Sequence, residues 1–182
     1  MVLGSNSPRR RELLNDMGVK FRVEVIKGID ETYPASLPVE EIPVYLARIK
    51  AEGHPLQPDE LLITADTVVV LDDEVLGKPC GEADAHHMLR ALSGRAHRVI
   101  SGVCVTTAER AEAFADMSIV RFAELTDDEI DYYIEHYRPL DKAGAYGIQE
   151  WIGNIGIAGI NGDFYNVMGL PTRKLYQVLK TF

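Results

Sequence analysis

The stretch Leu61-Leu62-Ile63-Thr64-Ala65-Asp66-Thr67-Val68-Val69-Val70 decides the interpretation of the whole chain. It is apolar and rich in β-branched residues, without polar alternation, and its length suits one strand buried on both faces of a sheet. Asp66 is the exception, because a carboxylate in low dielectric is costly unless a cation, a hydrogen-bond network or a proton compensates it. Asp66 therefore predicts a positive partner. Asp66 can belong to a functional site or, equally, can only cap a turn or pair with a structural arginine.

Size and composition limit the class of protein. The 182 residues are 46% hydrophobic, which predicts a single domain over 1–182, with any second lobe drawn from roughly residues 95–150. The net charge of −9 argues against a nucleic-acid binder, which needs a basic face. There is no run of about 18 apolar residues and no secretory signal, so we expect a cytoplasmic protein without a membrane partner. Cys80 and Cys104 lack metal-type spacing and are expected to be reduced thiols.

The first loop and helix suggest an anion site. Residues 4–8 form a polar loop, with Ser7 as the N-cap and Pro8 as the first residue of the helix. Residues 9–11 are three arginines in the first turn, where the helix dipole disfavours cations unless an anion lies there. Together with the Ser5 and Ser7 hydroxyls and the exposed amides, they describe a phosphate site. A solvated basic start of a helix is the alternative.

Three further segments carry candidate residues. Lys50 lies near the end of a helix predicted over about 40–52, where the helix dipole by itself favours a cation. Asp30 and Glu31 lie in an acidic turn and could ligate a hard cation such as magnesium, although adjacent loop acids are often only solvated. Lys78 closes a short hairpin that begins at the turn over 72–74, which places it close to the central strand.

Several other elements follow from local patterns. The alternation over 21–25 predicts a half-buried strand, and the runs 98–106 and 112–124 predict a pair of strands. Thr126 and Glu129 form a capping box for a helix that runs to about Tyr137. The Asn-Gly pair at 161–162 predicts a hairpin between 155–160 and 164–168, and an amphipathic helix follows residue 171. Hairpins and strand-helix alternation together indicate an α/β or α+β fold around one largely continuous sheet.

Residues 141–149 form the last candidate segment. Its small residues would let the backbone approach a ligand closely. Asp141, Lys142 and Gln149 are candidates for contacts to phosphate, metal and base.

Seven segments, taken in order, carry a joint pattern: Gly4-Ser5-Asn6-Ser7-Pro8-Arg9-Arg10, Leu46-Ala47-Arg48-Ile49-Lys50-Ala51, Ala65-Asp66-Thr67-Val68-Val69, Gly77-Lys78-Pro79, Leu92-Ser93-Gly94 with His97, Asp141-Lys142-Ala143-Gly144-Ala145-Tyr146-Gly147-Ile148-Gln149, and Val167-Met168-Gly169-Leu170-Pro171. They span nearly the whole chain and resemble the Maf family of nucleoside triphosphate pyrophosphatases. The resemblance implies an elongated α/β fold similar to the inosine triphosphatase type, a mixed sheet flanked by helices, two lobes with a central cleft, and often a homodimer. It also implies hydrolysis of a nucleoside triphosphate to the monophosphate and pyrophosphate with a divalent metal, Mg or Mn.

The resemblance also suggests a branch of the family. Arg9, Thr67 and Gln149 match the residues of the branch that acts on dTTP and UTP, whereas the 7-methyl-GTP branch tends to have tyrosine, glutamine and glutamate there. A glutamine amide both donates and accepts, which suits the uracil or thymine edge. Trp151 follows Glu150 where many members have a glycine.

Residue roles follow from the resemblance as a hypothesis. Ser5, Arg9 and Arg10 would hold the phosphates, while Lys50 and Lys78 would neutralise the charge that develops on the leaving pyrophosphate. Asp66 would activate water or hold the metal, with Glu31 as a second metal ligand. Two alternatives stay open: a nucleotide-binding regulator of septum formation without turnover, and a pyrophosphatase for another nucleotide such as 7-methyl-GTP or ITP.

Overall fold

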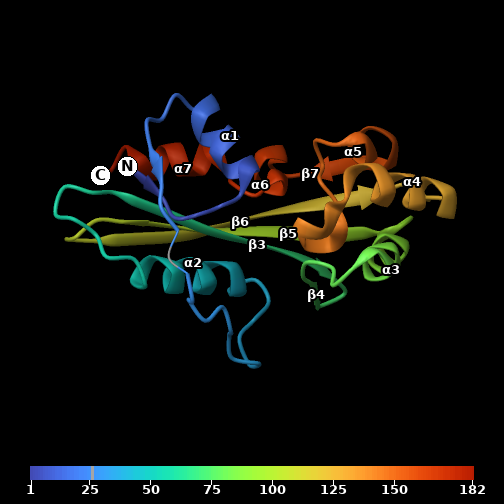
Figure 1. Ribbon diagram of the computed structural model, residues 1–182, viewed down its shortest axis with the longest axis horizontal. Helices are drawn as coiled ribbons and strands as arrows, with labels where there is room; N and C mark the ends of the chain where they lie inside the picture. The colour runs from blue at the N-terminus through green and yellow to red at the C-terminus, as the bar shows by residue number, and fades with distance from the viewer. Residues whose placement is uncertain (26) are drawn as a thin grey trace. The chain divides into compact units, whose positions relative to one another are not determined.

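The computed structural model describes residues 1–25 and 27–182 and shows a mixed α/β fold (Figure 1). In these residues one seven-stranded sheet has the order β2-β1-β3-β5-β6-β7, and β4 pairs with β3. Parallel pairing joins β1 to β2 and β3, whereas β3–β4 and β6–β7 are antiparallel. The predicted α/β class with a mixed sheet flanked by helices is confirmed. The strands are β1 (Val2–Leu3), β2 (Arg22–Val23), β3 (Leu62–Leu71), β4 (Glu74–Leu76), β5 (Ala96–Thr106), β6 (Ala111–Phe122) and β7 (Ile157–Asn161).

The helices of the described residues accompany this sheet. They are α1 (Pro8–Asp16), α2 (Ile42–Glu52), α3 (Glu82–Leu92), α4 (Asp127–Tyr137), α5 (Trp151–Gly156), α6 (Phe164–Met168) and α7 (Thr172–Leu179), with short 3-10 turns η1 (Pro139–Asp141) and η2 (Ala143–Ala145). Two predicted helix starts are confirmed: Ser7 caps α1, and Thr126 and Glu129 form the capping box of α4. In the part of the chain that the structure describes, no helix combines the length and the hydropathy needed to cross a bilayer.

The chain is organised into two compact units. Unit 1 comprises Met1–Thr67, Ile100–Asp116 and Gly169–Phe182, and unit 2 comprises Val68–Val99 and Met117–Met168. Within unit 1, α1 and α7 lie on one side of the sheet and α2 lies on the other (Figure 1). Within unit 2, α3 packs against α4 and against the η turns. The strands β3, β5 and β6 contribute residues to both units.

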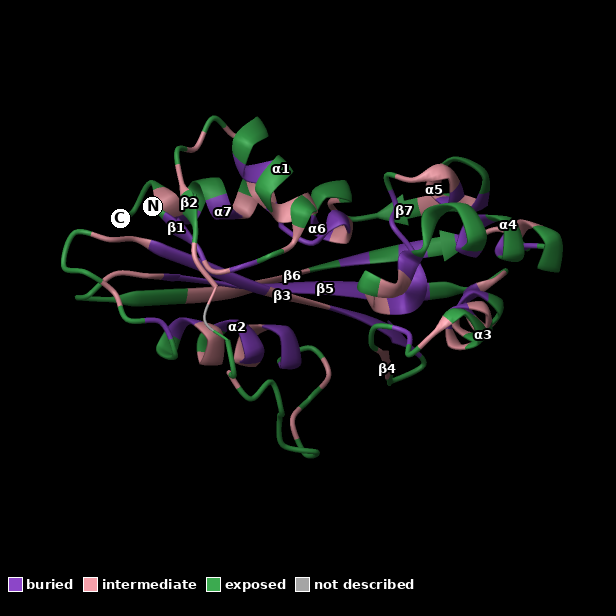
Figure 2. Ribbon diagram, in the orientation of Figure 1, coloured by how far each residue is buried: buried purple, intermediate pink, exposed green. Residues whose placement is uncertain are grey.

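The central strand β3 has the predicted burial. All its residues are buried except Asp66 and Thr67, which are half-buried (Figure 2). The strand leaves through a tight turn in which Asp72 and Asp73 have φ of 52° and 80°. Positive φ at both central residues is what a two-residue hairpin needs. The predicted β3–β4 hairpin is confirmed by the Val70–Val75 pairing.

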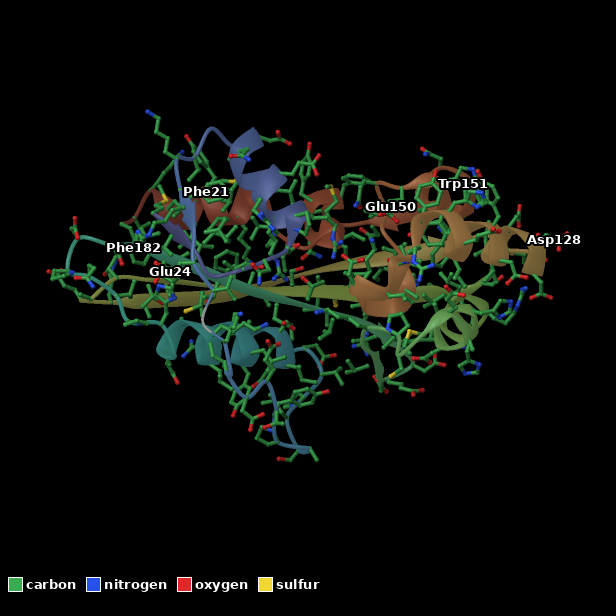
Figure 3. All side chains as sticks on the ribbon, in the orientation of Figure 1. Phe21, Glu24, Asp128, Glu150, Trp151 and Phe182 are labelled. Carbon is green, nitrogen blue, oxygen red and sulfur yellow. The ribbon has the colours of Figure 1, made fainter. Side chains whose placement is uncertain are left out.

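The predicted half-buried strand over 21–25 is wrong in its pattern. Only Arg22 and Val23 form β2, and both are exposed, whereas Phe21, whose side chain is labelled in Figure 3, is half-buried. The reason is position, since β2 is an edge strand that pairs with the two residues of β1 alone. At the edge of the sheet fewer residues surround each side chain, so the side chains of β2 stay exposed.

The predicted hairpin at 161–162 is also wrong, because the second arm is the helix α6. The backbone N–H of Tyr165 donates to Asp163 Oδ1 at 2.8 Å, a capping contact typical of a helix start. The backbone N–H of Asp163 donates to Ser118 Oγ at 3.0 Å, and Asn166 Nδ2 donates to the same oxygen at 2.9 Å. These contacts to β6 redirect the chain into a helix, and they lie outside any local turn signal.

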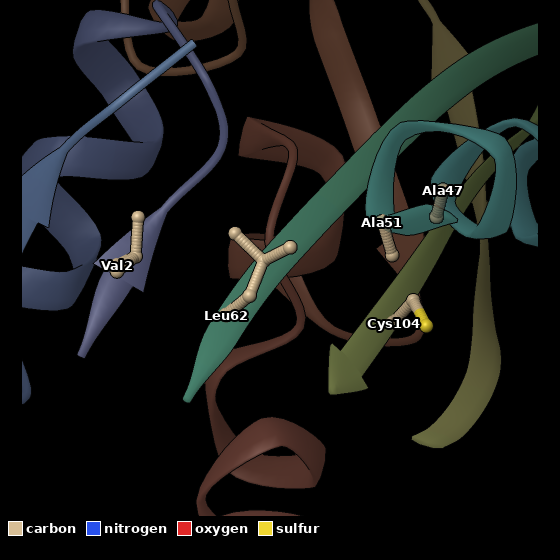
Figure 4. Packing of buried hydrophobic residues seen from close by; sticks show 5 residues of the cluster. All are labelled: Val2, Ala47, Ala51, Leu62 and Cys104. Atoms are coloured by element: carbon tan, nitrogen blue, oxygen red, sulfur yellow. The ribbon is translucent and has the colours of Figure 1, made fainter. Parts of the chain in front are cut away.

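Small residues bring α2 close to the sheet in unit 1. A built Cβ on Gly102 of β5 would lie 2.2 Å from the Pro43 carbonyl carbon, so only glycine fits there. Thr64 Oγ1 donates to the Ala47 carbonyl oxygen at 2.6 Å and joins β3 to the middle of α2. A cluster of small and medium apolar residues fills the contact (Figure 4): Val2, Ala47, Ala51, Leu62 and Cys104. Cys104 is a free buried thiol and Cys80 a free exposed one, as predicted.

His97 is a buried titratable group in unit 2. Its Nε2 lies 2.7 Å from Tyr146 Oη, and its ring stacks on Phe122 with the centroids 5.5 Å apart. Burial lowers the pKa of His97 from 6.5 to about 4. The folded protein therefore keeps this imidazole neutral at pH values where the unfolded chain protonates it.

We expect the free energy of unfolding to fall by about 2 kcal/mol between pH 7.5 and pH 5 because of His97. Only the unfolded state binds the proton in this range, so stability is complete above pH 6.5 and declines as the pH falls toward 4. Urea unfolding at both pH values should show that His97→Gln removes this part of the decrease. His87→Gln, at an exposed position of α3, should keep the whole decrease. An undiminished decrease in His97→Gln would contradict the argument.

Candidate functional site

The side-chain repeats of strand β3 and helix α2 together place Lys50 next to Asp66 within unit 1. Alternate residues of a strand share a face, so Thr64 and Asp66 point to the same side of β3. Thr64 is bonded to Ala47, and Lys50 lies three residues further along α2 on the same side of the helix. Lys50 Nζ lies 2.7 Å from Asp66 Oδ1 and 2.9 Å from Glu31 Oε2. The positive partner of Asp66 is therefore Lys50, which also holds Glu31.

This group of three is negative and only partly open to solvent. The side chains of Asp66 and Lys50 are 17% and 15% exposed, while that of Glu31 is 56% exposed. Two carboxylates share one ammonium, so the group carries a net charge of −1. Charges interact more strongly in such a partly buried place than in bulk water. The arrangement favours a further cation or a proton at the open carboxylate oxygens.

Arg10 reaches β3 from the first turn of α1. Its Nη1 donates to the Ala65 carbonyl oxygen at 2.8 Å and to Ser5 Oγ at 3.2 Å. Its Nη2 donates to Thr67 Oγ1 at 3.0 Å, and its Nε donates to the Gly169 carbonyl oxygen at 2.9 Å. Within the described residues these bonds use four of the five N–H donors of the guanidinium. Arg10 therefore acts mainly as a clamp, meaning that its hydrogen bonds hold the residues on either side of Asp66 against the first loop and Gly169.

The electrostatics of Arg10 agree with this position. Burial lowers the pKa of Arg10, and the neighbouring Asp66 carboxylate opposes that shift. Arg9, one residue earlier, adds to the lowering. A guanidinium stays charged under all these influences, so Arg10 brings a fixed positive charge beside Asp66.

Ser5, Arg11 and Arg9, the other candidate residues of the first loop and helix, differ in exposure and in their partners. Ser5 is buried, and its Oγ accepts from the Ser7 backbone N–H at 3.3 Å as well as from Arg10. Arg11 Nη2 donates to the Asn6 carbonyl oxygen at 2.7 Å on the surface. Arg10 and Arg11 thus donate to carbonyl oxygens of the protein, although the sequence predicted that the three arginines bind an anion. Arg9 is half-buried in the first turn of α1.

Lys78 and Gln149 lie in unit 2, and both are exposed. Within that unit, the Gly144 backbone N–H donates to the Gly77 carbonyl oxygen at 3.1 Å, which joins the end of the β4 hairpin to the 141–149 segment. Gly144 has φ of 66° and lies so close to Val69 that a built Cβ would be 3.0 Å from its Cγ1. A glycine at residue 144 is therefore what lets this segment pack on β3.

The contacts of Glu150 and Tyr133 were not predicted from the sequence. Lys142, a candidate phosphate contact, is buried, with its Nζ 2.7 Å from Asp141 Oδ1 and 3.2 Å from Glu150 Oε1. Tyr133 Oη donates to Glu150 Oε2. One signal was available: a lysine within a run of small and apolar residues needs a nearby buried acid.

The candidate metal ligands, Asp66 and Glu31, can supply two carboxylates to a hard divalent cation, but not a complete set of ligands. Magnesium is commonly held by one or two carboxylates together with substrate phosphates and water, and not by a complete protein cage. Asp66 and Glu31 already converge on a single cation, the Lys50 ammonium. Among residues 1–25 and 27–182, no three His, Cys, Asp or Glu side chains gather as a ligand set. The donor chemistry matches a cation shared between protein and substrate.

Comparisons with known proteins show the family and support the fold. A family model described as Maf-like protein matches residues 1–182. A dTTP/UTP pyrophosphatase of Phocaeicola vulgatus is 56% identical over 182 residues, which cover 99% of this chain and 94% of that protein. A dTTP/UTP pyrophosphatase of Parabacteroides distasonis is 56% identical over 184 residues, covering 100% and 95%. The structure of a HAM1 protein from Coxiella burnetii has a similar fold, with a TM-score of 0.52 and 18% identity over 100% of this chain and 98% of that one. The chain belongs to the Maf family.

Proposed function

We propose that this protein is a nucleoside triphosphate pyrophosphatase that hydrolyses dTTP and UTP to the monophosphate and pyrophosphate. The observation that carries the proposal is the half-buried ion pair between Asp66 of β3 and Lys50 of α2, with Glu31 on the same ammonium. Acid, ammonium and the Arg10 guanidinium together supply a proton acceptor and the charge compensation that phosphoryl transfer requires. The names of the relatives at 56% identity support the choice of substrate.

In the proposed reaction, a water oxygen attacks the α phosphorus and the bond to the bridging oxygen breaks. Pyrophosphate leaves with the bond electrons, and the proton of the water passes to Asp66 or, through it, to solvent. Lys50 and the exposed Lys78 compensate the charge on the bridging oxygen and the pyrophosphate. Arg9 and the N-terminus of α1 bind phosphate oxygens, while Arg10 mainly holds β3 and Ser5 in place.

A divalent metal, Mg or Mn, forms part of the proposal. Asp66 and Glu31 would hold it together with the substrate phosphates. When bound, such an ion lowers the pKa of water and neutralises phosphate charge. This chain's own residues would still orient the triphosphate and accept the proton.

The choice of base is assigned to Gln149 and Thr67. The Gln149 side chain is exposed, and its amide can both donate to a carbonyl and accept from the single N–H of thymine or uracil. Thr67 Oγ1 is held by Arg10 and lies 2.8 Å from Ser101 Oγ. These contacts hold the Thr67 side chain in one rotamer, in which it would contribute to the choice of base.

The experiment is incubation with Mg²⁺ or Mn²⁺ and a panel of dTTP, UTP, CTP, 7-methyl-GTP and ITP, followed by chromatography of the products. We expect monophosphate and pyrophosphate from dTTP and UTP, with much less from the other three. Preferred cleavage of 7-methyl-GTP or ITP would replace the substrate assignment. Nucleotide binding without turnover would favour a regulator. The proposal also includes a homodimer, which light scattering of the purified chain measures.

A further inference from the structure

The segment that presents Gln149 is a closed turn in unit 2. The Glu150 backbone N–H donates to the Gly147 carbonyl oxygen at 3.0 Å, so residues 147 and 150 are the two ends of a four-residue turn. Of the two central residues, Ile148 is 5% exposed and packs inward, whereas Gln149 is exposed. Gln149 thus projects from a turn that is anchored directly beside it.

A buried tyrosine ties both ends of this turn together. Tyr133 of α4 is fully buried, and its Oη accepts from the Gly147 backbone N–H at 3.0 Å. The same hydroxyl donates to Glu150 Oε2. Burial, and then the Glu150 carboxylate, raise the pKa of Tyr133, so its proton stays in place to make this bond. One hydroxyl therefore fixes the distance between the first and last residues of the turn.

The second oxygen of Glu150 is held as well. Lys142 Nζ lies 3.2 Å from Glu150 Oε1 and 2.7 Å from Asp141 Oδ1, and the lysine side chain is 8% exposed. The turn closes tightly around this carboxylate, since a built Cβ on Gly147 would lie 2.9 Å from Glu150 Cδ. The Glu150 side chain, labelled in Figure 3, is thus fixed from both oxygens by groups of the same unit.

We propose that Glu150, held by Tyr133 and Lys142, is a positioning residue that orients Gln149 and thereby sets the discrimination between bases. The inference rests on the proposed function, in which Gln149 contacts the base. A hydrogen-bonding side chain discriminates well only when its direction is fixed, because a mobile amide adjusts to a wrong partner. Glu150 itself touches no base and acts through the turn.

A purely structural network predicts a different result from a positioning network. Loss of stability, or a general distortion of the site, would change kcat/KM for all nucleotides by the same factor. Loss of the Gln149 orientation would lower kcat/KM for dTTP more than for CTP, which presents a different hydrogen-bonding edge. The ratio of the two values is therefore the readout that separates the two roles.

The test is a double-mutant cycle on that ratio with the full chain. Glu150→Gln keeps the shape but offers one oxygen where the carboxylate offered two, and it places an amide N–H₂ beside Lys142 or Tyr133. We expect the dTTP to CTP ratio to fall about tenfold, mainly through KM. In the Gln149→Ala background the same change should lower the ratio no further. Glu82→Gln is the matched control, because Glu82 forms an exposed ion pair with Arg138 in the same unit.

Two outcomes would overturn the proposal: an unchanged ratio in Glu150→Gln, or an equal further fall in the Gln149→Ala background. If Glu150→Gln does not fold, as judged by circular dichroism, Tyr133→Phe decides by the same criterion, since it keeps the buried ring and removes only the bridging hydroxyl. Wild-type protein that does not cleave dTTP would refute the proposed function instead. The two failures are therefore distinguishable.

Discussion

The Asp66→Asn variant is expected to retain its fold and to lose at least a hundredfold in kcat for dTTP. The amide has the shape of the carboxylate and can still accept from Lys50 Nζ, which also keeps its ion pair with Glu31. What disappears is the negative charge, and with it the ability to accept a proton from water or to hold a cation. General base catalysis by a positioned side chain contributes about 10²–10⁴ in rate. Steady-state kinetics and circular dichroism measure the two parts of the expectation.

Asp73→Asn is the control for Asp66→Asn. Asp73 also pairs with a cation, since its Oδ1 lies 2.8 Å from Arg98 Nη2, but its side chain is 93% exposed. An exposed ion pair contributes about 0–1 kcal/mol to stability, so this variant should match the wild type in both stability and kcat. Near-normal turnover by Asp66→Asn would remove Asp66 from the centre of the site. A fall that extra Mg²⁺ or Mn²⁺ restores would favour a metal ligand over a general base.

Local patterns were sufficient to predict much of the fold. The apolar run that became β3 needed no knowledge of its neighbours, because a strand buried on both faces is written in its own residues. The Thr126–Glu129 capping box is equally local, since donor and acceptor lie three residues apart. The positive partner of Asp66 was also predictable in kind, because a half-buried carboxylate demands one.

Contacts between distant residues decided what local patterns could not. The chain after residue 161 forms α6 because Asp163 and Asn166 bond to Ser118, and those partners lie 45 and 48 residues away. The Glu150–Tyr133 bond joins residues 17 apart, on a helix and a turn that no periodicity brings together. Likewise, the three arginines of α1 look alike in the sequence, and only the fold separates the half-buried Arg10, which is bonded to distant acceptors, from the exposed Arg11.

Replacing Arg10 with lysine is expected to destabilise the protein by about 3 kcal/mol, because the Arg10 acceptors come from three separate parts of unit 1. The Ala65 and Gly169 carbonyl oxygens lie 55 and 159 residues away in the chain, and Ser5 and Thr67 supply hydroxyls. Lysine has three donors on one nitrogen and cannot reach four acceptors spread around a planar fork. At least one acceptor would stay unsatisfied. For a chain of this size, about 3 kcal/mol lowers Tm by about 6–12 °C, which a thermal melt resolves.

Two neighbouring arginines make the Arg10 experiment specific, because all three belong to the first turn of α1. Arg11→Lys should change Tm by less than about 2 °C, since its contact to the Asn6 carbonyl oxygen is exposed. Arg9→Lys should raise KM for dTTP, because Arg9 binds phosphate oxygens in the proposed function and a lysine cannot form a bidentate contact to phosphate. If Arg10→Lys raised KM without lowering Tm, Arg10 would be a phosphate ligand and not a clamp. The three variants together thus separate the charge that binds substrate from the charge that holds Asp66 and its strand in place.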